Sequence, residues 1–184
     1  ITESVGGQYS QLLFPDFDNG TVVKAFSFEC DLRIGNGVGN DGRPADGFSI
    51  NYARANDPQV LNLINNREAA DNSGYAASGA AETGTVTGIA VSFDTWSGNA
   101  LPDGPDIEGI IVRVDNTTVT RVNLPVRNGA CDDVNSLQTG PWDGVAGSEP
   151  GTGVPDALCW QKFKVDLAEN GELTVSYKGR VLLD

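Results

Sequence analysis

The stretch Ala25-Phe26-Ser27-Phe28-Glu29-Cys30-Asp31-Leu32-Arg33-Ile34 decides the fold class, because apolar and polar residues alternate along it from Phe26 onwards. A period of two places the apolar side chains on one face of a β-strand and the polar side chains on the other. The stretch therefore predicts a half-buried strand with a solvated outer face.

The same alternation recurs along the chain in short segments. These segments cover residues 48–52, 89–94, 110–114, 119–126, 163–167 and 173–177. Turn dipeptides such as Asn36-Gly37, Asp103-Gly104 and Asn170-Gly171 lie between them. Many short alternating strands with few helical stretches predict an all-β, antiparallel sandwich or barrel.

One segment departs from the period of two. Asp57-Pro58 is a helix N-cap followed by Pro at the first helical position, and Val60, Leu61, Leu63 and Ile64 follow it. We expect one short helix at most. Residues 69–87 and 128–158 are predicted to be long exposed loops, and loops of this kind on a rigid sandwich commonly carry function.

Composition narrows the class of protein. The 184 residues suffice for a single domain over residues 1–184, and no run approaches the roughly 20 apolar residues of a membrane span. The net charge is 12 minus 25, or −13, which argues against nucleic acid and anionic membranes as partners. Surplus carboxylates suit Ca²⁺, neutral glycans or basic partners, or simply keep an exported protein soluble. The absence of His excludes His-based catalytic triads and His-ligated zinc.

The cysteines number three, and none lies in a C-x-x-C pair. Cys30 falls on the apolar side of its strand, where a buried thiol behaves as a small hydrophobe. Cys131 and Cys159 bracket a loop rich in Gly, Asp and Pro, so we expect any disulfide to join these two.

Asn19-Gly20-Thr21 and Asn116-Thr117-Thr118 match the acceptor pattern for N-glycosylation.

Several segments, taken in order, carry a family resemblance. Ala45-Asp46-Gly47-Phe48-Ser49-Ile50 looks like the strand opening of legume lectins, and Gly88-Ile89-Ala90-Val91-Ser92-Phe93-Asp94-Thr95-Trp96 is similar to their "VAVEFDT-aromatic" strand. The stretches 160–165 and 170–175 resemble a late hairpin of bacterial lectin-like domains. Together they resemble the L-type-lectin and laminin-G-like class, also called concanavalin A-like. That resemblance implies an antiparallel two-sheet jelly-roll sandwich.

The resemblance implies a sugar ligand at Asp46. In the family this Asp accepts hydrogen bonds from sugar hydroxyls, and the peptide bond before it, here after Ala45, is often cis. A carboxylate suits the task because two vicinal hydroxyls can donate to its two oxygens. The alternative is that Asp46-Gly47 only begins a strand after a turn.

The resemblance also implies a Ca²⁺ site in the loop after Asp94. The positions that match the family's ligands are Asp94, the carbonyl of Trp96, Asn99 and Asp103, with Asp106 as the alternative to Asp103. All of these are hard oxygen donors, as Ca²⁺ requires. We therefore expect Ca²⁺ as the cofactor.

This chain also departs from the family pattern. Ser92 stands where the family has a metal-binding Glu, and no His is present, so the Mn²⁺ half of the family's metal site is lost. The spacing after Asp94 differs by about one residue. Without an ion, Asx-turns of Asp94 and Asn99 would hold the loop.

Two Trp residues are candidates for stacking on a sugar. Trp96 and Trp142 lie in predicted loops, with Tyr75 as a weaker candidate, and for Trp142 packing within its loop remains an equal alternative. Trp160 precedes an alternating strand, so we expect it in the core.

The end of the sequence differs from the family. Lectin-like domains continue beyond this hairpin with closing strands, whereas this chain stops at Asp184, just after Val181-Leu182-Leu183. The domain closes differently, or the chain is cut, or a second polypeptide or domain completes the sheet after Asp184 by β-augmentation. We expect the edge to be covered, because an open apolar edge promotes aggregation.

These observations favour a non-catalytic, carbohydrate-binding, lectin-like module of a secreted or cell-surface protein. The sugar would bind on loops near Asp94, with Asp46, Trp96, Asn99 and Trp142 as the residues that contact it. The main alternative is a structural or adhesive jelly roll that contacts other protein chains and binds no sugar. We do not expect an enzyme. Related glucanases use E-x-D-x-x-E, which is absent here, and Asp106-Ile107-Glu108 is the nearest carboxylate pair.

Overall fold

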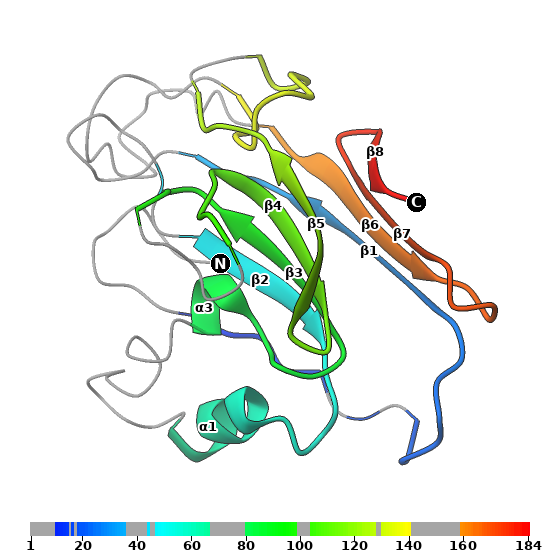
Figure 1. Ribbon diagram of the computed structural model, residues 1–184. Helices are drawn as coiled ribbons and strands as arrows, with labels where there is room; N and C mark the ends of the chain where they lie inside the picture. The colour runs from blue at the N-terminus through cyan, green and yellow to red at the C-terminus, as the bar shows by residue number, and fades with distance from the viewer. Residues whose placement is uncertain are drawn as a thin grey trace. The chain divides into compact units, whose positions relative to one another are not determined.

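The computed structural model describes residues 10–14, 16, 18–35, 44, 47–66, 80–98, 104–127, 130–140 and 159–184. Among these residues the secondary structure is nearly all β, with eight strands and two short helices (Figure 1). The chain divides into two compact units, one of residues 1–6, 10–43 and 127–184 and the other of residues 7–9 and 44–126. Each unit contains one antiparallel four-stranded sheet, so the all-β class with two antiparallel sheets is confirmed.

The first unit holds a sheet in the order β1-β6-β7-β8. Its strands are β1 (Phe26–Leu32), β6 (Gln161–Leu167), β7 (Leu173–Tyr177) and β8 (Arg180–Leu183). Alternation along β6 and β7 buries Phe163, Val165, Val175 and Tyr177. The free thiol of Cys30 on β1 is half-buried, and burial raises its pKa.

The opposite face of this sheet is charged. The Nζ atom of Lys162 lies 2.9 Å from Glu29 and 3.1 Å from Asp31, and Lys164 pairs with Asp166 at 2.7 Å. These groups are exposed, so their contribution to stability is small. The pairs mark this face as solvated, as the alternation along β1 predicts.

The second unit holds a sheet in the order β2-β3-β4-β5. Its strands are β2 (Gly47–Tyr52), β3 (Ile89–Asp94), β4 (Gly109–Val114) and β5 (Thr117–Asn123). Every residue of β3 is buried, so this strand is covered on both faces. One face is apolar, with Phe93 stacked on Phe48 at 4.6 Å, while the other buries Ser92, Asp94 and Arg113.

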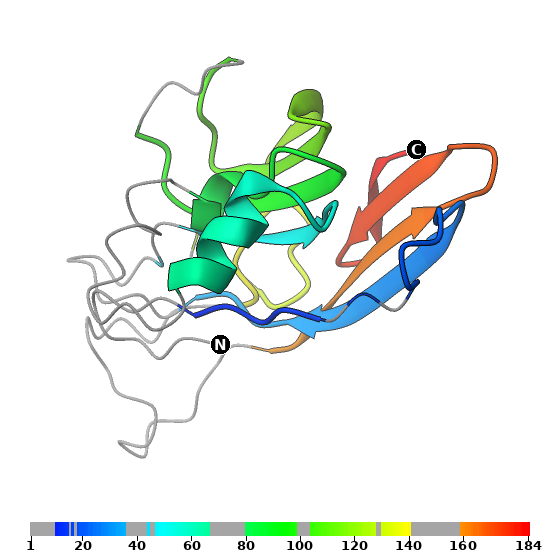
Figure 2. The same cartoon turned by 90° about the horizontal axis from the view of Figure 1, so that it is seen from below.

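Two helices accompany the second sheet (Figure 2). The predicted helix is present as α1 (Pro58–Asn66), and α3 (Ala80–Thr83) adds a single turn that contacts β2 and β3. An exposed loop throughout 69–87 is therefore wrong for its described part: Thr85 is buried, and its backbone N–H donates to Asn51 Oδ1 at 3.1 Å. Side-chain acceptors of this kind satisfy the backbone of an irregular segment and allow it to be buried.

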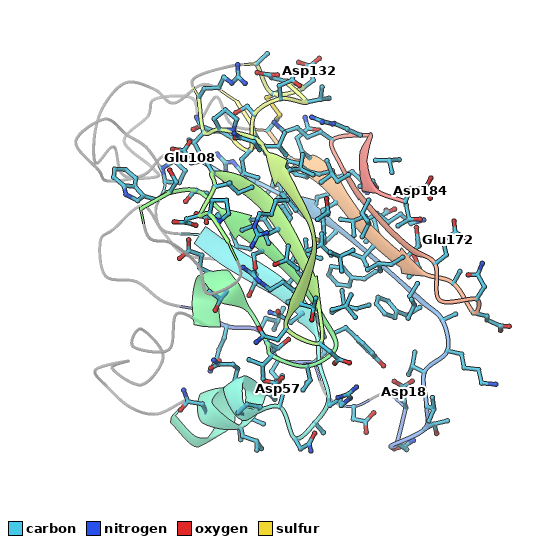
Figure 3. The ribbon with its side chains drawn as sticks, in the orientation of Figure 1. Asp18, Asp57, Glu108, Asp132, Glu172 and Asp184 are labelled. Atoms are coloured by element: carbon cyan, nitrogen blue, oxygen red, sulfur yellow. A yellow bond between two sulfur atoms is a disulfide. The ribbon has the colours of Figure 1, made fainter. Side chains whose placement is uncertain are left out.

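Asp57 fixes the start of α1 (Figure 3). Its buried carboxylate accepts hydrogen bonds from the backbone N–H of Gln59 at 2.8 Å and from both the N–H and the hydroxyl of Thr87 at 2.7 Å. Burial works to raise the pKa of Asp57, but these hydrogen bonds outweigh it and hold the pKa below its usual value. The N-cap therefore also holds the segment that leads into β3.

Candidate functional site

Three carboxylates of the second unit converge at the end of β3. Glu82 comes from α3, Asp94 is the last residue of β3, and Asp106 lies in the segment before β4. One oxygen of each lies within 4.8 Å of the others, so the group is able to hold a metal ion. Asp94 is only 1% exposed, which places one carboxylate of the cluster out of water.

Backbone hydrogen bonds tie the loop after β3 to this cluster. The N–H of Trp96 donates to Asp94 Oδ1 at 3.1 Å, and the N–H of Gly98 donates to Asp106 Oδ2 at 2.8 Å. The first contact is the Asx-turn expected of an Asp two residues before its donor. The loop conformation therefore depends on the same side chains that form the cluster.

The electrostatics of the cluster are unfavourable without a cation. Burial, hydrogen bonds with Asp106 and Glu82, and the negative charge of Glu82 raise the pKa of Asp94 to about 9. Without a cation, a proton on Asp94 relieves the repulsion between these carboxylates. The donor set consists of carboxylates alone, which suits a hard cation such as Ca²⁺ rather than a softer transition metal.

The start of β2 lies beside the cluster. Gly47 pairs with Asp94 in the β2–β3 register. A Cβ atom on Gly47 would lie 2.4 Å from the carbonyl oxygen of Phe93, so this close approach requires glycine. The two sequence segments that resemble the lectin motifs are therefore neighbours in one sheet. Ala45 and Asp46, with the cis bond expected between them, lie outside the described residues.

The predicted site residues are only partly brought together. Asp94 and the alternative ligand Asp106 join in the cluster, and Trp96 lies next to them with its side chain 43% exposed. The remaining predicted residues lie outside the described part of the chain: Asn99, Asp103, Trp142 and the weaker stacking candidate Tyr75. Sequence reasoning missed Glu82, because it lies in a stretch of small and polar residues with no periodicity.

Asp106 and Glu108, the nearest carboxylate pair considered for catalysis, make separate contacts. Asp106 belongs to the cluster, whereas Glu108 Oε2 accepts a hydrogen bond from the N–H of Val126 at 3.0 Å. That contact positions the chain beyond β5. Each carboxylate therefore has a local structural partner of its own.

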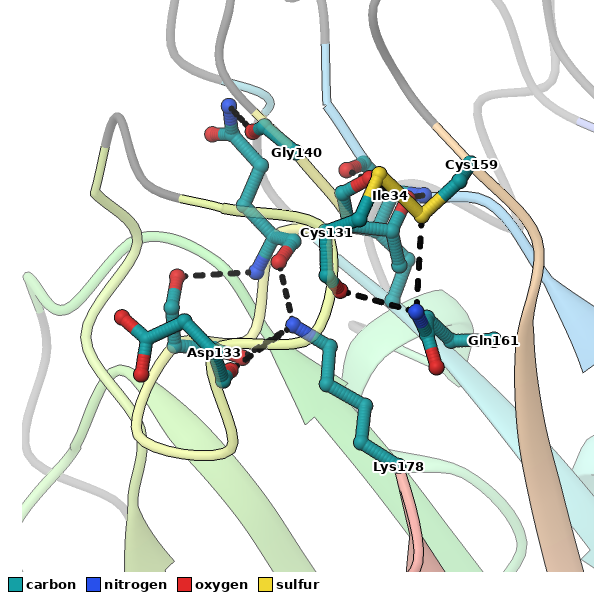
Figure 4. Close-up of a disulfide and its surroundings, with 10 residues drawn as sticks. Ile34, Cys131, Asp133, Gly140, Cys159, Gln161 and Lys178 are labelled. Carbon is teal, nitrogen blue, oxygen red and sulfur yellow. Dashed lines mark hydrogen bonds between the residues drawn. A yellow bond between two sulfur atoms is a disulfide. The ribbon is translucent and has the colours of Figure 1, made fainter.

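The predicted disulfide is present in the first unit (Figure 4). Cys131 and Cys159 are bonded, with their Cα atoms 5.8 Å apart. Gln161 Nε2 donates to the carbonyl of Cys131 at 2.9 Å, which ties the bridge to the start of β6. The described part of the loop, residues 130–140, is thereby fastened to the sheet.

Lys178 binds backbone carbonyl groups of the same loop. Its Nζ donates to three carbonyl oxygens, those of Asp133 at 3.0 Å, Ser136 at 2.9 Å and Gln138 at 2.5 Å (Figure 4). Burial lowers the pKa of Lys178 to about 8, so the ammonium remains the main form at neutral pH. The hydroxyl of Tyr177 adds a hydrogen bond to the carbonyl of Leu137 at 2.8 Å. An ammonium has three donors, and here each has an acceptor.

The expectation that Trp160 lies in the core is wrong. The side chain is 65% exposed rather than part of the core. Along β6 the period of two places Trp160 in phase with Lys162 on the charged face, whereas Phe163 points to the buried face. The burial of Trp160 therefore follows its position in the strand alternation rather than its size.

Comparison with protein-family models, with curated proteins and with solved structures finds no match to this chain. The lectin-like resemblance therefore rests on the order of its sequence motifs alone. Among the described residues, no helix is long and apolar enough to cross a membrane.

Proposed function

We propose that this chain is a non-catalytic, carbohydrate-binding module of an exported protein, with a Ca²⁺ ion held by Glu82, Asp94 and Asp106. The observation that carries the proposal is the acidic cluster with the half-exposed Trp96 beside it. The cluster offers a cation the hard oxygen ligands it prefers. The Trp offers a sugar the flat apolar surface against which its C–H groups pack.

The ion and the sugar would be coupled through the loop after β3. Cation binding replaces the proton on Asp94 and holds Asp94 and Asp106 at one place. The amides of Trp96 and Gly98 donate to these two side chains, so the same event fixes the loop. A fixed loop presents the indole ring without further loss of conformational entropy on sugar binding.

Affinity for a single sugar is expected to be modest. A small site makes few hydrogen bonds, and these must offset the desolvation of many hydroxyls. Strong attachment would then require several sites acting together.

The Cys131–Cys159 bridge supports an extracellular or cell-surface location, because disulfides persist in oxidising compartments.

A glycan array read with Ca²⁺ and again with a chelator tests this proposal. We expect bound glycans in Ca²⁺, loss of the signal on chelation, and loss of the signal in Trp96→Ala. Trp160→Ala is the matched control, since Trp160 is also exposed but belongs to the other compact unit. We expect Trp160→Ala to retain binding.

Two results would count against the proposal. An array without signal in Ca²⁺ would favour the alternative, a structural or adhesive module that contacts protein chains and binds no sugar. A signal that Trp160→Ala abolishes and Trp96→Ala leaves unchanged would place a sugar site in the other unit.

A further inference from the structure

The segment that supplies Glu82 lies against the sheet of the second unit. The helix α3 contacts β2 and β3. A Cβ atom on Gly84, just after the helix, would lie 2.9 Å from the Cβ of Ala90 on β3, so the two chains are in direct contact there. Glu82 reaches Asp94 from this docked segment. The third carboxylate of the cluster therefore depends on how α3 is held against the sheet.

Arg113 of β4 makes a contact that holds α3 in place. Its side chain is 5% exposed, and its Nη1 atom donates to the carbonyl oxygen of Thr83, the last residue of α3, at 3.4 Å. The same atom donates to Ser92 Oγ on β3 at 3.1 Å. A guanidinium out of water requires such acceptors, because an unpaired buried charge is costly. The two hydrogen bonds connect α3 with the two central strands of the sheet.

The strand pairing places Arg113 on the face of the sheet that carries the cluster. Arg113 is opposite Ala90 in the β3–β4 register, and Ala90 shares its face with Ser92 and Asp94 because side chains alternate along a strand. The pairing of β4 with β5 shifts between Val112 and Arg113. An irregularity of this kind re-aims side chains and is common next to functional sites.

We propose that Arg113 is a positioning residue of the cation site: it fixes α3 against the sheet and so holds Glu82 close to Asp94 and Asp106. This inference rests on the proposed ion site. Arg113 does not bind the ion itself, because a guanidinium has donors and no acceptor. Side chains that orient metal ligands from outside commonly change metal affinity by about 10- to 100-fold.

The direction of the effect separates positioning from simple electrostatics. A positive charge near the site repels a cation, so removal of Arg113 would tighten Ca²⁺ binding if charge alone mattered. Loss of positioning weakens binding instead. We expect Arg113→Met to raise the dissociation constant of Ca²⁺ about tenfold in calorimetric titration. Arg54→Met is the matched control: it removes a positive charge from an exposed pair with Asp115 in the same unit, and it should bind as the wild type does.

A double-mutant cycle tests whether Arg113 acts through Glu82. In the Glu82→Gln background, Arg113→Met should have little further effect, because the carboxylate that it positions is already absent. Tb³⁺ serves for the cycle, since its higher charge strengthens binding to the remaining carboxylates. Ser92→Ala removes one acceptor of the guanidinium without a change in charge. It should also weaken binding, and only while Glu82 is present, so it provides the same test if circular dichroism shows that Arg113→Met does not fold.

The lifetime of Tb³⁺ luminescence in ordinary and in heavy water adds a spectroscopic measure, the number of waters on the ion. If Arg113→Met withdraws Glu82 from the ion, about one more water should be bound than in the wild type. Unchanged or tighter binding by Arg113→Met, or an equal loss of affinity with and without Glu82, would overturn the inference and leave the ion site standing. A wild type that binds neither Ca²⁺ nor Tb³⁺ would overturn both.

Discussion

Replacing Cys131 and Cys159 together by Ser is expected to lower the free energy of unfolding by about 3–4 kcal/mol, because the bridge closes a loop with a sequence separation of 28 residues. In the chain-entropy model this constraint acts on the unfolded chain. Urea unfolding followed by circular dichroism gives the difference directly.

Cys30→Ala is the control for removing sulfur without removing the bridge. Cys30 is free and half-buried, so its loss should have a much smaller effect. Equal destabilisation by the two changes would contradict the assignment of this stability to the bridge.

Lys178→Met is expected to destabilise the protein by about 3 kcal/mol, since it removes a charged donor from buried carbonyl oxygens of the loop. The methionine stem fills similar volume, so the effect reports the ammonium rather than a cavity. Hydrogen exchange of the amides in residues 130–140 should increase together with the loss in unfolding free energy.

Lys162→Met is the matched control for this change. Lys162 lies on β6 of the same unit, but its partners Glu29 and Asp31 are exposed, so we expect little change in stability. A Lys162 variant as unstable as the Lys178 variant would show that net charge, rather than the three carbonyl contacts, explains the loss.

The strands were the part of the fold most readily predicted from sequence. Alternation gave β3 and β7 with their observed bounds and placed the other predicted strands within a few residues, because burial on a pleated sheet has a strict period of two. The helix α1 was predicted from Asp57-Pro58, since an N-cap and a Pro at the first position are local signals. Cys131 and Cys159 were paired from the character of the loop between them.

The candidate site was predicted less completely. Asp94 was found because it ends an alternating strand, but Glu82 has no local signal: the fold of α3 against β2 and β3 brings it to Asp94. The burial of the polar face of β3 was not predicted, for a related reason. Alternation marks Ser92 and Asp94 as solvated, whereas both are buried: Arg113 Nη1 donates to Ser92 Oγ at 3.1 Å, and Glu82 and Asp106 lie close to Asp94.

Calorimetric titration of Ca²⁺ into chelator-treated protein tests the central claim, that Glu82, Asp94 and Asp106 hold a cation. We predict one ion per chain and a gain in stability of about 2.7 kcal/mol at a Ca²⁺ concentration near 100 times the dissociation constant. Asp94→Asn keeps an oxygen for the Trp96 N–H and resembles the protonated Asp, so it should fold normally and lose the ion. Glu169→Gln removes one charge from an exposed turn and should bind as the wild type does. Absence of binding by the wild type, or binding that Asp94→Asn leaves unchanged, would contradict the claim.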